Sequence, residues 1–122
     1  MATSVAIIHA QDFIRATPDG LLDLATSKEV LIDIAAASGP LVDYRILIDT
    51  RHAQVSMSTA DLWYLAAELS EHGKAFLRRT AVLCPLEGFD QAGFFALCAK
   101  NRAFPVSAFT SFEDAIEWLT AK

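Results

Sequence analysis

The chain has 122 residues, with 15 acidic against 10 basic side chains, a formal net charge of −5 and a hydrophobic fraction of 53%. This length suits one domain over residues 1–122 with a single core, and so high an apolar content excludes an intrinsically disordered chain. The negative balance argues against a nucleic-acid binder, which depends on basic side chains that neutralise phosphates.

The first residues lack the basic segment and the long apolar segment of a secretion signal. The two cysteines, Cys84 and Cys98, stand in apolar surroundings and make no disulfide framework. We therefore expect a cytoplasmic protein with buried free thiols. The apolar runs are far shorter than the roughly 20 residues that cross a bilayer, so any membrane contact is expected to be peripheral at most.

The first predicted elements are strands. Residues Met1–Gln11 are open to two interpretations, an extra edge strand or a loose tail. Further on, the turn-forming residues Pro18–Gly20 separate two apolar segments, Phe13–Thr17 and Leu21–Leu24. This pattern predicts a β-hairpin.

A helix is predicted to begin at Thr26, because Thr26 and Glu29 have the spacing of a capping box. Gly39 followed by Pro40 is a typical helix end. The next segment, Tyr44–Asp49, is a continuous apolar run that ends in an acid. Such a run predicts a strand covered on both faces.

The second strand–helix unit repeats this pattern. Ser58 and Asp61 have capping-box spacing, which predicts a helix from Ser58, and Gly73 is a suitable end for it. The apolar segment Thr80–Cys84 then predicts a second buried strand, which Pro85 ends.

The last third of the chain continues the alternation. Asp90 is predicted to cap a third helix, Pro105–Phe109 to form the last strand and Ser111 to cap the final helix. The order of elements predicts a single α/β domain, with a mixed sheet of about five strands and about four helices packed on it.

The sequence contains no paired metal-ligand spacing, no glycine-rich phosphate loop and no Gly-x-Ser-x-Gly elbow. We therefore expect no cofactor, no metal and no catalytic residue. Ligands of α/β proteins bind at the carboxyl ends of strands, where Asp49, Arg51 and His52 stand. An enzyme that uses these three residues is the least favoured interpretation, because no second acid, base or nucleophile can be identified.

Three hydroxyl side chains, Ser56, Ser58 and Thr59, stand where the loop after Asp49 enters the predicted second helix. A hydroxyl at a helix N-terminus normally acts as a cap. A phosphate at the same position is stabilised by free N–H groups and by the helix dipole. The residues alone leave both roles open, a cap or a phosphorylation switch.

Three segments resemble the SpoIIAA-like (STAS-like) family of small bacterial domains. They are the strand–loop–helix Ile46–Leu62, the strand Ala81–Pro85 with Phe89–Phe95 after it, and the closing segment Phe109–Leu119. The resemblance implies an α/β fold and a non-enzymatic regulatory or protein-interaction module. In the anti-sigma-factor antagonists of this family a partner kinase phosphorylates a serine at the start of the second helix. Ser58 has the matching position, although Met57 and the residues Thr59–Asp61 depart from the usual motif.

SpoIIAA-like domains are also similar in topology to CRAL-TRIO lipid-exchange domains, which implies an alternative function in binding a small apolar or lipid-like ligand. Four aromatic residues are not accounted for by the predicted helix faces. They are expected to flank an apolar pocket or a homodimer interface: Trp63, Tyr64, Phe76 and Phe89.

The function predicted from the sequence is therefore a regulatory module that binds a protein partner and forms a homodimer. Binding of a small apolar ligand is the alternative, and no nucleic acid is expected. The predicted surface for partner binding or switching covers the loop after the first buried strand and the start of the next helix, namely Asp49, Arg51, His52, Ser56, Ser58 and Thr59.

Overall fold

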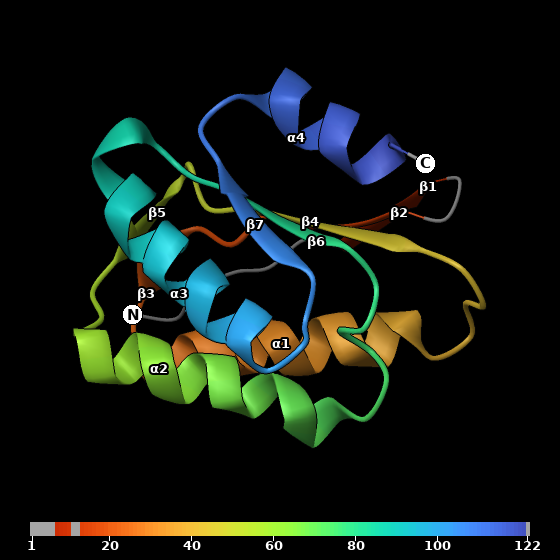
Figure 1. Cartoon of the computed structure of the whole chain (residues 1–122), viewed down its shortest axis with the longest axis horizontal. Coiled ribbons are helices and arrows are strands. Elements are labelled where there is room, and N and C mark those ends of the chain that lie inside the picture. The colour runs from red at the N-terminus through yellow and green to blue at the C-terminus, as the bar shows by residue number, and fades with distance from the viewer. Residues whose placement is uncertain (1–6, 11–12, 122) are drawn as a thin grey trace.

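The computed structural model describes the backbone of residues 7–10 and all of residues 13–121. Strands and helices alternate over most of this part of the chain (Figure 1). The elements are β1 (Ile7–Ala10), β2 (Phe13–Ala16), β3 (Gly20–Leu22), α1 (Leu24–Ser38), β4 (Arg45–Asp49), β5 (Ala53–Val55), α2 (Thr59–Glu68), a 3₁₀ turn (Leu69–His72), β6 (Thr80–Leu83), a 3₁₀ turn (Leu86–Gly88), α3 (Phe89–Asn101), β7 (Val106–Phe109) and α4 (Phe112–Thr120).

Within these described residues the main sheet has five strands in the order β1-β2-β4-β6-β7. Strand β1 is antiparallel to β2, and the other neighbours are parallel. The predicted fold class, α/β with a mixed sheet of about five strands and four helices, is confirmed. Of the predicted edge strand or tail, residues 7–10 form the edge strand, and residues 1–6 and 11 lie outside the described residues.

The predicted hairpin at Pro18–Gly20 is wrong. Strand β2 is paired on both edges, antiparallel to β1 and parallel to β4, so no edge is left for β3. Instead the chain turns away at Gly20, which has a positive φ of 75°. Strand β3 then pairs in parallel with β5 in a separate two-stranded sheet, with Leu22 opposite Val55. The turn residues do turn the chain, but out of the main sheet.

Two of the four predicted caps are confirmed and two are displaced. Ser58 caps α2 and Ser111 caps α4, as predicted. Helix α1 begins two residues earlier than predicted, because Asp23 is its N-cap and Thr26 completes the capping box. Helix α3 follows a 3₁₀ turn directly, so Gly88 occupies the N-cap position and Asp90 falls within the first turn.

The two faces of the sheet are covered unequally (Figure 1). Helices α1, α2 and α3 pack on one face over a large core that includes Ile46, Ile48 and Val82. Helix α4 lies on the other face, where a smaller cluster joins Leu47 and Leu83 to residues of α4. The alternation of Ile46, Leu47 and Ile48 between the two faces explains why the centre of β4 is continuously apolar.

No helix in the described part of the chain combines the length and the apolar character that are needed to cross a membrane. Nor do three or more His, Cys, Asp or Glu side chains of residues 13–121 gather in a way that could hold a metal ion.

Candidate functional site

The carboxylate of Asp49 is the centre of a polar cluster at the end of β4. Its side chain is fully buried. Arg51 holds both oxygens: its Nε and backbone N–H donate to Oδ1 at 3.0 and 3.1 Å, and its Nη2 donates to Oδ2 at 2.9 Å. Arg15 of the neighbouring strand β2 donates from Nη2 to Oδ2 at 3.3 Å. Asp49 thus fixes the turn that starts at Arg51.

These contacts keep the Asp49 carboxylate ionised. Burial raises the pKa of Asp49, but the hydrogen bonds and the charge of Arg51, together with the bond from Arg15, outweigh it and bring the pKa below its ordinary value of 3.8. The hydrogen bond to Asp49 in turn raises the pKa of Arg51, with a further contribution from the charge of Glu113. A carboxylate held so firmly as an anion is suited to positioning the loop rather than to transferring protons.

The turn after Asp49 is bound to the next strand of the sheet. Thr50 donates to the carbonyl of Leu83 at the end of β6 from its backbone N–H at 2.8 Å and from its hydroxyl at 3.0 Å. His52 is exposed on this turn, and Ser56 is exposed after β5. The backbone N–H of Ser56 donates to Leu22 of β3 at 2.8 Å. The loop is therefore held at both ends, with the side chains of His52 and Ser56 exposed.

Ser58 closes the loop and starts α2. Its hydroxyl accepts a hydrogen bond from the backbone N–H of Asp61 at 3.1 Å, and the Asp61 carboxylate accepts one from the backbone N–H of Ser58 at 3.1 Å. Both Ser58 and the following Thr59 are exposed. The structure therefore gives Ser58 the role of a cap, with its hydroxyl within reach of a modifying partner.

Two of the four aromatic residues continue this exposed N-terminus along α2. Trp63 lies one helical turn after Thr59, and Tyr64 one turn after Ala60, so the four share a face. Trp63 is 48% exposed and Tyr64 56%, and their rings meet edge to face with centroids 5.2 Å apart. We call Ser58, Thr59, Ala60, Trp63 and Tyr64 the α2 surface.

The Arg102 guanidinium after α3 lies over the Trp63 ring, 4.8 Å from its centroid. This cation–π contact restrains the Trp63 side chain although almost half of it is exposed. An exposed and restrained aromatic side chain loses little rotational freedom when it is covered by a partner.

The remaining two aromatic residues do not join the α2 surface. Phe76 is fully buried in the core, where its ring meets that of His72 edge to face at 5.7 Å. Phe89 is the first residue of α3 and is exposed. Neither of them contributes to a common pocket with Trp63 and Tyr64.

The predicted switch residues also separate into two groups. Asp49 shares the face of the sheet that carries Leu47 and α4, and Arg15 beside it lies over the ring of Phe112 in α4, 5.7 Å from the centroid. Ser58 and Thr59 belong to α2, on the opposite face of the sheet. The loop connects two distinct regions, of which the α2 surface is the more apolar.

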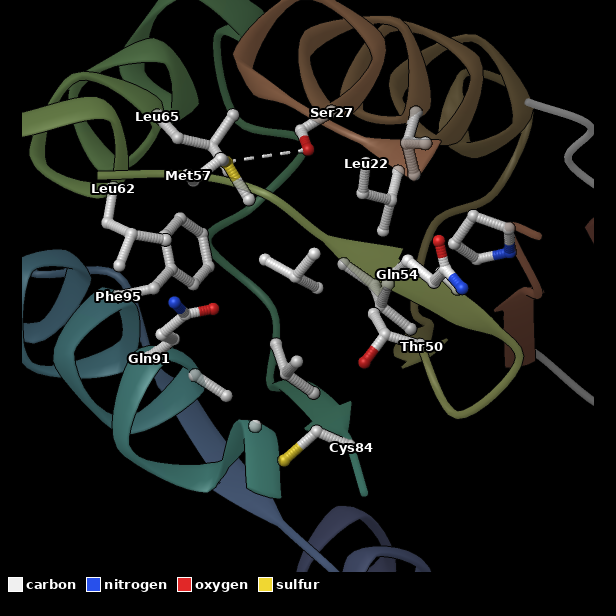
Figure 2. Close-up of a pocket in the computed structure, with 18 of the residues that line it drawn as sticks. Leu22, Ser27, Thr50, Gln54, Met57, Leu62, Leu65, Cys84, Gln91 and Phe95 are labelled. Atoms are coloured by element: carbon white, nitrogen blue, oxygen red, sulfur yellow. Dashed lines mark hydrogen bonds between the residues drawn. The ribbon is translucent and has the colours of Figure 1, made fainter. Parts of the chain in front are cut away.

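A cavity of about 390 Å³ lies inside the ring formed by the ends of β4 and β6, the β3–β5 sheet and helices α1, α2 and α3 (Figure 2). None of the four aromatic residues singled out in the sequence lines it. Its wall instead includes Leu22, Leu62, Leu65 and Phe95. Because the lining residues come from strands of both sheets and from three helices, no local sequence pattern indicates them. The one general signal is their position at the carboxyl edge of the sheet.

No model of a known protein family matches the chain, and no curated protein matches its sequence. Solved structures do share its fold. A DUF3478-family protein with a SpoIIAA-like fold from Shewanella loihica PV-4 superimposes with a TM-score of 0.59 at 22% identity, over 97% of this chain and 94% of that one. An anti-sigma factor antagonist from Mycobacterium paratuberculosis superimposes with a TM-score of 0.62 at 16% identity, over 98% of this chain and 96% of that one. The anti-sigma factor antagonist SpoIIAA in its unphosphorylated form superimposes with a TM-score of 0.56 at 16% identity, over 99% of this chain and 100% of that one. The chain therefore has the SpoIIAA-like fold that its sequence resembles.

Proposed function

We propose that this chain, a domain with the SpoIIAA-like fold, is a regulatory protein-interaction module that binds its partner through the α2 surface. The observation that carries the proposal is the exposure of Trp63 and Tyr64 on the face of α2 that also carries Thr59 and Ala60, in the first turn after the capping residue Ser58. Two of the proteins with this fold are described as anti-sigma factor antagonists, which supports a function in protein binding.

The chemistry of the α2 surface suits a protein partner. Tryptophan and tyrosine are enriched among the residues that dominate binding energy at protein interfaces, because they bury a large area and keep a polar group for hydrogen bonding. Trp63 and Tyr64 are adjacent, exposed and free of charge. The polar groups of Ser58 and Thr59 at one end of the surface provide the rim that such interfaces have around their apolar centre.

Ser58 provides a point of control at the edge of this surface. A phosphate on its hydroxyl would replace the hydrogen bond from the Asp61 N–H with charge-assisted bonds to the N-terminus of α2. It would also place negative charge close to the Asp61 carboxylate, at the N-terminal end of the helix that carries the aromatic pair. Phosphorylation of Ser58 is accordingly expected to weaken the binding of a partner that covers Trp63.

An anti-sigma factor is the partner class to test first, because proteins of this fold are described as antagonists of such factors. Calorimetric titration of the chain with each anti-sigma factor of its source organism should identify one that binds. In the double variant Trp63→Ala/Tyr64→Ala we expect the affinity to fall at least about 30-fold, the effect of losing about 2 kcal/mol at an interface hot spot.

Val42→Ala is the matched control, because Val42 is 88% exposed and lies outside the α2 surface; its affinity should equal that of the wild type. Ser58→Asp should weaken binding and Ser58→Ala should not. The proposal fails if no anti-sigma factor binds, or if the double variant binds as well as the wild type.

A second copy of the chain is the other protein that the same aromatic pair suits, as the sequence predicts. Sedimentation velocity tests this: a homodimer that uses the α2 surface is converted to monomer by Trp63→Glu, whereas a wild-type monomer ends the homodimer hypothesis. We place the module in the cytoplasm, where the buried free thiols Cys84 and Cys98 remain reduced.

A further inference from the structure

The cavity at the carboxyl edge of the sheet has the size of a small-molecule site. Its volume is about 390 Å³, within the range of roughly 300–1,000 Å³ that is usual for ligand pockets. Its walls belong to both sheets and three helices, so the cavity is formed by the fold itself and not by one mobile loop (Figure 2).

The walls are mainly apolar. Eight large apolar side chains that are more than nine-tenths buried line it, and they come from β3, α1, β4, α2, β6 and α3: Leu22, Val30, Leu31, Ile48, Leu62, Leu65, Val82 and Phe95. Smaller side chains, among them Ala53 and Ala92, leave the space between them. An occupant must therefore present apolar surface over most of its length.

The charged side chains around the cavity disfavour an anion. Among the residues that the structure describes, no lysine, arginine or histidine lines it, and the single charged residue in its wall is the exposed acid Glu87. A carboxylate or phosphate inside these walls would lose its hydration without gaining a cationic partner, and Glu87 would repel it. This argument favours an uncharged occupant over a fatty acid of the same size.

A few polar groups are available to orient such a molecule. The buried hydroxyl of Ser27 donates only to the thioether sulfur of Met57, at 3.7 Å, which leaves its oxygen free to accept a hydrogen bond. The side chains of Gln54 on β5 and Gln91 on α3 stand on different sides of the cavity (Figure 2).

The hydroxyl of Thr50 and the thiol of Cys84, by contrast, are bound to the carbonyls of Leu83 and Phe109. Free donors and acceptors are therefore few, and they suit a ligand with one or two polar atoms.

We infer that this cavity binds an uncharged, predominantly apolar small molecule that carries a hydroxyl or carbonyl group. The apolar body of the molecule lies between β4, β6 and Phe95, and its oxygen lies near Ser27 or one of the two glutamine amides. This site is separate from the α2 surface, and it does not depend on the proposed binding of a protein partner.

The test compares two probes of equal chain length, 1-decanol and decanoate, in calorimetric titrations of the purified chain at neutral pH. We expect decanol to bind at least tenfold more tightly than decanoate. Ala92→Phe fills the cavity and should lower the affinity for decanol at least tenfold. Ala36→Phe makes the same change at an exposed position of α1 that does not line the cavity, and it should bind decanol as the wild type does.

Circular dichroism checks that the variants are folded. If Ala92→Phe does not fold, Ala53→Leu takes its place, since it fills the cavity from β5. The inference is overturned if decanol does not bind, if decanoate binds as tightly as decanol, or if a folded cavity-filling variant keeps the wild-type affinity. Because no protein partner is present in these titrations, a negative result leaves the proposal for the α2 surface untouched.

Discussion

Replacing Asp49 by asparagine tests how the turn before the α2 surface is held. The substitution keeps the shape of a fully buried side chain but removes the charge that accepts hydrogen bonds from Arg51 and Arg15. Breaking a buried ion pair costs about 3–5 kcal/mol when the remaining charge stays buried.

Here the two arginine side chains are 38% and 39% exposed, so they can turn toward water and part of that cost is avoided. We therefore expect Asp49→Asn to lower the free energy of unfolding by about 2–3 kcal/mol at neutral pH.

The same substitution has a defined pH dependence. The folded-state pKa of Asp49 lies below its ordinary value of 3.8, so its ionisation stabilises the folded chain. That stabilisation is fully present above about 3.8 and is lost as the pH falls through the lower, folded-state pKa. The difference between wild type and variant should therefore be constant near neutrality and shrink as the pH falls below 3.8.

Urea unfolding, followed by circular dichroism over this pH range, measures both effects. Asp43→Asn is the control, because Asp43 forms its ion pairs with Arg45 and Arg78 at the surface and should change stability by less than about 1 kcal/mol. The reasoning is refuted if Asp49→Asn is as stable as the wild type at neutral pH, or if its deficit stays the same in acid.

Three further predictions concern other parts of the fold. Phe76→Ala should lower the free energy of unfolding by about 3–5 kcal/mol, because it empties a fully buried site. Trp63→Ala should lower it by less than about 1 kcal/mol. Equal losses in urea unfolding would contradict the assignment of Phe76 to the core and Trp63 to the surface. Asp23→Ala should lower the urea midpoint and Glu29→Ala should not, because Asp23 is the N-cap of α1. A lower midpoint for Glu29→Ala alone would instead support the capping box of Thr26 and Glu29 that the sequence predicts. In a Cys98→Ser variant, the thiol of Cys84 should react slowly with an aromatic disulfide reagent until urea is added, since burial and then the charge of Glu87 raise its pKa. Rapid reaction of this variant in its native form would show that Cys84 is accessible.

The sequence predicts the elements that carry their own local signals. Strand β4 is recognisable because both of its faces are buried, which makes its central residues Ile46–Ile48 continuously apolar. Helices α2 and α4 are recognisable because Ser58 and Ser111 cap them. These features depend on neighbouring residues and are therefore readable from a short window of sequence.

The sequence-based predictions are wrong where residues distant in the sequence determine which strands pair. A turn at Pro18–Gly20 predicts that the chain reverses, but which strand pairs with β2 depends on β4, about thirty residues further along. Strand β5 has only three residues and forms a sheet because β3 lies beside it. Short strands of this kind take their structure from tertiary pairing and have little local preference.

The candidate site shows the same division. Its loop and the start of α2 could be located from the sequence, because strand ends and helix caps are local. The pairing of Arg15 with Asp49 joins residues 34 positions apart and has no sequence signature. The four aromatic residues share only their absence from the predicted helix faces, and this property does not separate the exposed Trp63 from the buried Phe76.

The most direct test of the central claim is a map of the partner's contacts on the chain. The ¹⁵N-labelled chain, titrated with the anti-sigma factor that it binds, should show its largest amide shift changes within Ser58–Tyr64, and Trp63→Ala should abolish them. Largest changes along α4 and around Arg51, with Ser58–Tyr64 unaffected, would contradict the assignment of partner binding to the α2 surface.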